Sequence, residues 1–123
     1  MYVYIISNEA FDGWLKVGKT NSIHRRLETF RTGAPTEYIV EFLMDGLRYD
    51  HEVHVLLTKQ GIERKREWFK CDLDTARTAV LEAKAEQDRL DAMVEMNRLQ
   101  AANDGWIVSK RSADVAGKKQ VLK

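Results

Sequence analysis

A stretch of thirty residues without proline or glycine, from Asp74 to Asn103, most constrains how this chain of 123 residues can fold. The stretch is rich in Ala, Glu, Leu, Met and Arg, which favour helices, and Gly105 follows it as a helix stop. The sequence therefore predicts one long helix over residues 74–105, roughly 45 Å long at about 1.5 Å per residue. Residues 1–73 are left to form a folded domain.

Polar residues interrupt the apolar side of this predicted helix. Leu90 and Val94 continue the apolar stripe along the helix, but the polar residues Gln87 and Asn97 interrupt it. A strong coiled coil is therefore not expected. We expect the helix to be an accessory that either forms a homodimer with a second copy or contacts a substrate. The residues expected to pack on the preceding domain are Leu73, Ala76, Val80 and Ala83.

Charge and composition limit the classes of partner. Residues 1–73 carry eleven Lys/Arg and eleven Asp/Glu, which does not favour nucleic-acid binding by bulk charge alone. The apolar runs are too short to cross a membrane, no secretory signal is recognisable, and Cys71 is the single cysteine, so we expect a cytoplasmic protein. Residues 106–123 begin apolar and end basic, which predicts a tail docked at its start and disordered at its end.

Residues 1–73 predict a small α+β domain. Aromatic and β-branched residues indicate strands at 2–7 and 14–18, and the alternation at 36–44 indicates a third strand. Apolar spacing and caps predict helices over 23–32 and 50–59, the first with a stripe of Ile23, Leu27 and Phe30, and an extended segment over 66–69. In the second helix, Val53, Leu56 and Leu57 are expected to face inward and Glu52 and His54 to lie on other sides.

The first two strands predict a hairpin centred near Ala10. In that register Tyr4 pairs with Lys16, and both strands separate their side chains onto two faces. The polar and aromatic face carries Tyr2, Tyr4, Ile6, Trp14, Lys16 and Gly18. The aliphatic face carries Val3, Ile5, Leu15 and Val17.

Four residues with reactive or charged side chains occur in this domain at intervals that suit two strands and two helices. Tyr4, Lys16, Arg26 and Glu52 supply a phenol, an amine, a guanidinium and a carboxylate. Cleavage of a phosphodiester requires a proton acceptor, positive charge at the phosphate and an anchor for a divalent metal. Each residue singly is also typical of an ordinary strand aromatic or a solvated surface charge.

In the order and spacing of these residues, the chain resembles the GIY-YIG nuclease superfamily over about residues 2–70. The motifs read Tyr2-Val3-Tyr4 and Lys16-Val17-Gly18, Arg26 follows Gly18 by eight positions, and Glu52 opens a helix. Lys-Val-Gly, the Glu52 and His54 pair and Glu67-Trp68-Phe69 are similar to a phage and bacterial branch that has lysine in place of the second tyrosine.

The resemblance implies a three-stranded antiparallel sheet flanked by helices and single-metal hydrolysis of DNA, with RNA as an alternative substrate. Tyr4 would accept the proton of the attacking water, and the Lys16 ammonium would lower the pKa of its phenol. Arg26 would bind the non-bridging oxygens, and Glu52 would hold Mg²⁺ or Mn²⁺. His54 would contact the phosphate or assist proton transfer, a structural histidine being the alternative.

The substrate-contacting residues expected around this site are Tyr2, Gly18, Lys19, Arg25 and Arg31, with Gly18 letting the backbone approach the phosphate. Trp68 and Phe69 are expected in the core, with base stacking as the alternative. Lys16 in place of tyrosine and Phe30 in place of a polar residue depart from the pattern. They leave a second interpretation open, a catalytically weak or inactive nucleic-acid-binding module of the same fold.

Overall fold

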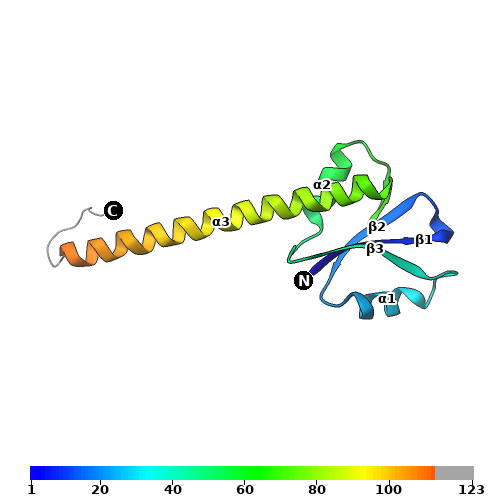
Figure 1. Cartoon of the computed structure of the whole chain (residues 1–123), viewed down its shortest axis with the longest axis horizontal. Helices are drawn as coiled ribbons and strands as arrows, with labels where there is room; N and C mark the ends of the chain where they lie inside the picture. Colours follow the sequence, from blue (N-terminus) through cyan, green and yellow to red (C-terminus); the bar gives the residue numbers. More distant parts are fainter. Residues whose placement is uncertain (113–123) are drawn as a thin grey trace. The chain divides into compact units, whose positions relative to one another are not determined.

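The computed structural model describes residues 1–112, and side chains up to residue 103, in an α+β arrangement of strands and helices (Figure 1). The domain begins with β1 (Tyr2–Asn8), the short 3-10 helix η1 (Glu9–Phe11), β2 (Trp14–Thr20) and α1 (Ile23–Arg31). It continues with β3 (Tyr38–Asp45), α2 (His51–Lys59), β4 (Arg64–Lys65), β5 (Trp68–Lys70) and α3 (Leu73–Ser112).

The sheet has five antiparallel strands in the order β3-β1-β2-β5-β4, so the prediction of three strands is wrong. The segment expected to be merely extended forms a hairpin of β4 and β5, and β5 pairs with β2 through Leu15 and Phe69. Arg66 adopts a positive φ of 57° in the tight turn of this hairpin. The polar and aromatic face is thereby extended by two strands.

The β1–β2 hairpin is shifted by two residues from the predicted register. Tyr4 pairs with Gly18 and Ile6 with Lys16, so residues 7–15, η1 among them, lie between the last paired residues, where the predicted register left residues 7–13. Asn8 caps η1 by accepting a hydrogen bond of 2.9 Å from the Ala10 amide, which holds the loop in a defined turn. Since side chains alternate with a period of two, a shift of two residues leaves every side chain on its predicted face.

The helix α1 covers one face of the sheet, and α2 with the first turns of α3 covers the other (Figure 1). The predicted aliphatic face is confirmed: Val3, Ile5, Leu15 and Val17 belong to the hydrophobic core. That core also contains Val53 and Leu57 of α2, with Leu56 packed against it, as predicted. On the opposite face, Phe30 of α1 lies against Tyr4, with ring centroids 6.4 Å apart.

Two details of the helices differ from the sequence predictions. The α1 stripe of Ile23, Leu27 and Phe30 is half-buried rather than buried, since α1 covers only part of the sheet face. His54 was expected away from the core, but only 7% of it is exposed. Its ring lies 5.3 Å from that of Phe69, because β5 joins the sheet beside β2.

The first turns of α3 complete the core. Ala76, Val80 and Ala83 are buried and Leu73 packs against them, as predicted. The predicted helix end at Gly105 is wrong, because α3 continues to Ser112; a single glycine costs only about 1 kcal/mol within a helix. The tail was expected over residues 106–123, docked at its start and disordered at its end. Residues 106–112 belong instead to α3, with side chains outside the described part of the chain, and residues 113–123 lie outside the described residues altogether. The chain divides into two compact units, Met1–Glu86 and Gln87–Lys123.

Candidate active site

Tyr4 and Gly18 form the centre of the polar and aromatic face. They are paired directly across β1 and β2, and only 2% of Tyr4 is exposed. The phenol occupies the space that a side chain at residue 18 would need: a Cβ there would lie 2.5 Å from Tyr4 Cζ and still closer to Oη. Gly18 was expected to admit the backbone to a phosphate, whereas in the structure it makes room for the Tyr4 ring.

Burial raises the pKa of Tyr4 to about 12, since desolvation disfavours the phenolate. The Arg26 guanidinium opposes this increase, whereas the Glu67 and Asp50 carboxylates add to it. The net pKa of the phenol is thus raised, and Arg26 is the cation that acts against this increase, whereas a lowering of the phenol pKa by Lys16 stays a prediction. At neutral pH Tyr4 is a protonated phenol, which can donate a hydrogen bond to an anionic oxygen.

The ammonium of Lys16 is engaged by a carboxylate rather than by the phenol. Its Nζ lies 2.8 Å from Glu67 Oε1, with 15% of the lysine side chain and 44% of the glutamate side chain exposed. The same Nζ lies 5.1 Å from the ring centroid of Phe30 and 5.9 Å from that of Trp68. Phe30 and Trp68 thus flank a cation that faces the sheet surface beside Tyr4.

Arg26 projects from α1 toward the same face. One of its terminal nitrogens, Nη2, donates to the backbone oxygen of Lys19 at 3.4 Å, and its guanidinium lies 5.8 Å from the Phe30 ring. The residue is exposed, so most of its five donors remain able to meet a ligand. The guanidinium and the phenol lie close enough for the charge of Arg26 to act on the pKa of Tyr4.

The acidic residue whose charge acts on Tyr4 from the start of α2 is Asp50. Its side chain is 15% exposed and forms no capping hydrogen bond with the helix that it precedes. Glu52, the predicted metal ligand, lies two residues further on, at an exposed position of α2. The structure thus brings Asp50 into the group around Tyr4, and metal binding by Glu52 stays a prediction.

His54 is held from both sides of its ring. Its Nε2 donates to the Val17 backbone oxygen at 2.9 Å and lies 3.7 Å from Asp50 Oδ2. Nδ1 accepts from Arg64 Nη2 at 3.5 Å, because a guanidinium can only donate. These contacts tie α2 to β2 and to Arg64 of β4, and a part in proton transfer stays a prediction.

The expected substrate contacts divide into two groups. Lys19 is exposed, its Nζ lies 4.8 Å from the Tyr49 ring centroid, and its own backbone oxygen accepts the hydrogen bond from Arg26. Arg25 and Arg31 are exposed on α1, and Arg31 lies 3.7 Å from Glu28. Tyr2 is half-buried at the start of β1. Lys19 therefore borders the group around Tyr4, whereas Arg31 is paired with Glu28 at the end of α1.

A divalent metal would have to be held here by few protein ligands. Among the side chains that the structure describes, those of residues 1–103, no three His, Cys, Asp or Glu are grouped as a metal site. Mg²⁺ keeps several waters and can be bound through one or two carboxylates, so the donor set fits such a site. The Asp50 carboxylate suits this role since no cap hydrogen bond occupies it.

Sequence reasoning missed two charged members of this group. Asp50 was interpreted only as a helix cap, although its spacing of four residues from His54 indicates side chains that meet on one helix face. Glu67 was noted only as part of a motif. Its pairing with Lys16 joins residues 51 positions apart, and no local pattern reports such a contact.

The structure defines a small α+β domain whose antiparallel sheet brings Tyr4 together with Arg26. The chain belongs to the T5orf172 domain family, whose model matches residues 1–84, and that family is generally considered related to the GIY-YIG proteins. No curated protein and no solved structure matches the chain. The matched residues end inside the first compact unit, Met1–Glu86.

Proposed function

We propose that this protein is a metal-dependent endonuclease that hydrolyses phosphodiester bonds of DNA, with RNA as an alternative substrate. The observation that carries the proposal is the meeting of a phenol and a guanidinium at one aromatic ring: the Phe30 ring lies 6.4 Å from the Tyr4 ring and 5.8 Å from the Arg26 guanidinium. The Asp50 carboxylate, at the start of α2, acts on the pKa of the same phenol. Membership of a GIY-YIG-like family supports the proposal. Within residues 1–112 no helix has the length and apolar character needed to cross a bilayer. A cytoplasmic location is part of the proposal, because a single cysteine, Cys71, is compatible with a reducing compartment.

Each residue has a distinct part in this proposal. Arg26 binds the non-bridging oxygens as negative charge grows on them, which is where preorganised donors contribute most. Tyr4, protonated in the protein alone, donates a hydrogen bond to the phosphate or to the attacking water. Lys16 supplies a second positive charge once the phosphate competes with Glu67 for it. Mg²⁺ or Mn²⁺, held by Asp50 or Glu52, would add positive charge at the phosphate oxygens.

Nicking of supercoiled plasmid DNA tests the proposal. We expect nicking with Mg²⁺ or Mn²⁺ that a chelator abolishes, and a rate at least about 100-fold lower in Arg26→Ala, the usual cost of one lost charge-stabilising donor. Asp50→Asn and Glu52→Gln should differ: the variant that lacks the metal ligand loses activity, and the other keeps most of it.

Arg77→Ala is the matched control, because Arg77 is a partly exposed arginine of α3 whose Nη2 is 2.5 Å from Asp74 Oδ1. It removes the same charge as Arg26→Ala and should nick at the wild-type rate. Nicking that survives Arg26→Ala, Asp50→Asn and Glu52→Gln alike would contradict a role for this group of residues.

A second candidate function is a nucleic-acid-binding module without turnover. Two observations favour it: the pKa of Tyr4 is raised to about 12, which makes the phenol a poor base, and Glu67 already engages Lys16. The same assay separates the two. DNA binding that depends on Arg26, with no nicking in any divalent metal, is the result expected of the binding module.

A further inference from the structure

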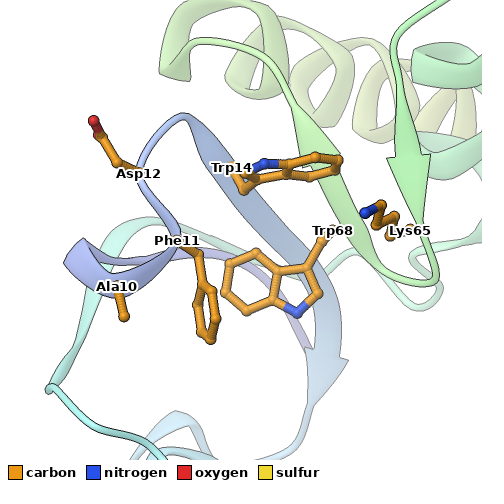
Figure 2. Close-up of a pocket in the computed structure, with 6 residues that line it drawn as sticks. All are labelled: Ala10, Phe11, Asp12, Trp14, Lys65 and Trp68. Atoms are coloured by element: carbon orange, nitrogen blue, oxygen red, sulfur yellow. The ribbon is translucent and has the colours of Figure 1, made fainter.

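An aromatic pocket lies beside the candidate active site. It has a volume of about 400 Å³, a size typical of small-ligand sites. The residues that line it are Ala10, Phe11, Asp12, Trp14, Lys65 and Trp68 (Figure 2). Its walls come from η1 and the loop after it, the first residue of β2, and the β4–β5 hairpin.

The strand register places this pocket on the same sheet face as Tyr4. Trp68 pairs with Lys16 across β5 and β2, and Lys65 pairs with Trp68 across β4 and β5. Directly paired residues of an antiparallel sheet share a face, and so do residues two apart, such as Trp14 and Lys16. If a nucleic-acid strand binds with one phosphate at Lys16, the neighbouring nucleotide therefore lies at the pocket.

Three aromatic rings give the pocket its chemistry. The Phe11 and Trp68 rings lie with centroids 5.2 Å apart in an edge-to-face arrangement, and Phe11 is 41% exposed (Figure 2). Trp14, on the other side of the pocket, is half-buried. Flat aromatic walls of this kind bind planar rings by stacking, and every nucleobase offers such a ring.

The charges around the rings suit an anionic ligand. The Lys65 ammonium lies 5.8 Å from the Trp14 ring centroid, and the Lys16 ammonium lies 5.9 Å from the Trp68 ring centroid. Figure 2 shows the Asp12 carboxyl group directed away from the rings. A planar base with a phosphate on each side matches aromatic walls with a cation near each indole, and at Lys16 that phosphate competes with the Glu67 carboxylate, 2.8 Å away.

We propose that this pocket binds one unpaired nucleobase adjacent to the phosphate held at Lys16 and Arg26. A base within a duplex is stacked and paired, so it reaches such a pocket only after leaving the helix, at a cost of a few kcal/mol. The pocket therefore selects single-stranded or branched substrates over continuous duplex. This inference rests on the proposed function, since it supplies the substrate class for the same site.

Binding of short oligonucleotides to the full chain in a chelator tests this inference without cleavage. We expect a single strand that carries 2-aminopurine to bind more tightly than a duplex of the same length, with quenched fluorescence as the base stacks on an indole. Trp14→Ala and Phe11→Ala should each weaken single-strand binding roughly tenfold, within the range for one lost stacking contact, and leave duplex binding unchanged.

Ile39→Ala is the control, because Ile39 is an apolar residue of β3 that is 54% exposed and does not line the pocket. If Trp14→Ala proves unfolded by circular dichroism, Phe11→Ala decides, since Phe11 is exposed on a short turn. Equal affinity for single strand and duplex, or wild-type single-strand affinity in Phe11→Ala, overturns the inference.

The outcome is separable from that of the nicking assay. Plasmid nicking without any single-strand preference would leave the proposed nuclease standing and remove the base pocket. Single-strand binding that depends on Phe11 and Trp14, without nicking in any metal, would retain the pocket and favour the binding module.

Discussion

Gly18 is the residue at which the smallest change should have the largest structural effect. The Tyr4 phenol fills the space beside its Cα, so a methyl group there would overlap Cζ and Oη. We expect Gly18→Ala to lower the free energy of unfolding by about 1–3 kcal/mol, the usual cost of overpacking. Denaturant unfolding measures this change.

A double-mutant cycle assigns the cost to the phenol. Tyr4→Phe removes Oη, the atom nearest to the added methyl group, so Gly18→Ala should cost less in the Tyr4→Phe background. Equal costs in both backgrounds would mean that the destabilisation has another origin, such as the backbone of β2.

Tyr4 should also make stability depend on alkaline pH. Its pKa is about 12 in the folded protein and about 10 in an unfolded chain, so the unfolded chain loses its proton first as the pH rises. The contribution of the neutral phenol is complete below pH 10, and between about pH 10 and pH 12 it declines by up to 1.4 kcal/mol per pH unit. Tyr4→Phe should lack this decline.

Free energies of unfolding of the wild type and Tyr4→Phe across that range measure the effect, since the other titrating groups are common to both proteins. Ultraviolet absorbance of tyrosinate provides a second readout, in which one tyrosine should ionise later than the rest. Parallel stability curves would show that the Tyr4 pKa is not raised.

At the level of helices and strands, α3 is divided between two compact units, and its first turns belong to the core. Ala76, Ala79, Val80 and Ala83 close the aliphatic side of the sheet over Val53 and Leu57. We therefore expect a chain ending at Glu86 to unfold cooperatively and a chain ending at Leu73 to lack a folded state, because its core would be open to water. Thermal circular dichroism of both distinguishes them, and a folded chain 1–73 would contradict this reading of the core.

The same elements show how far the sequence could predict the fold and the site. Local patterns located β1, β2, α1 and α2 within a few residues, since periodicity and caps are properties of neighbouring residues. The face of each hairpin residue was also predictable, because alternation survives a shift of two residues. These predictions needed no knowledge of distant contacts.

What could not be predicted depends on residues far apart in the chain. The pairing of β5 with β2 buries His54 under Phe69 and sets Glu67 against Lys16. The raised pKa of Tyr4 likewise follows from burial by neighbours such as Phe30 of α1. Each of these features exists only once the sheet has assembled, so the charges at the site were the hardest part to predict.

For the whole molecule, the exposed apolar residues of α3 bear on the oligomeric state. Within residues 87–103, α3 exposes several large apolar side chains, which are Leu90, Met93, Val94, Met96 and Leu99. Burial between two copies would remove them from water, so we predict a homodimer through this part of α3. Light scattering should give twice the 14.2 kDa mass for the full chain and a monomer for the chain ending at Glu86. A monomer in both cases would remove the dimer.

The outer position of β3 has a consequence for how the protein behaves at high concentration. β3 ends the sheet, and it exposes Ile39, Val40 and Leu43 along an unpaired strand edge, which is a template for self-association. Glu41 is the extra residue of a bulge between Phe42 and Val40, and its carboxylate accepts a hydrogen bond of 2.7 Å from the Ser7 hydroxyl. The bulge distorts the edge and places a negative charge in its middle, so we expect Glu41 to protect the protein against aggregation through strand addition.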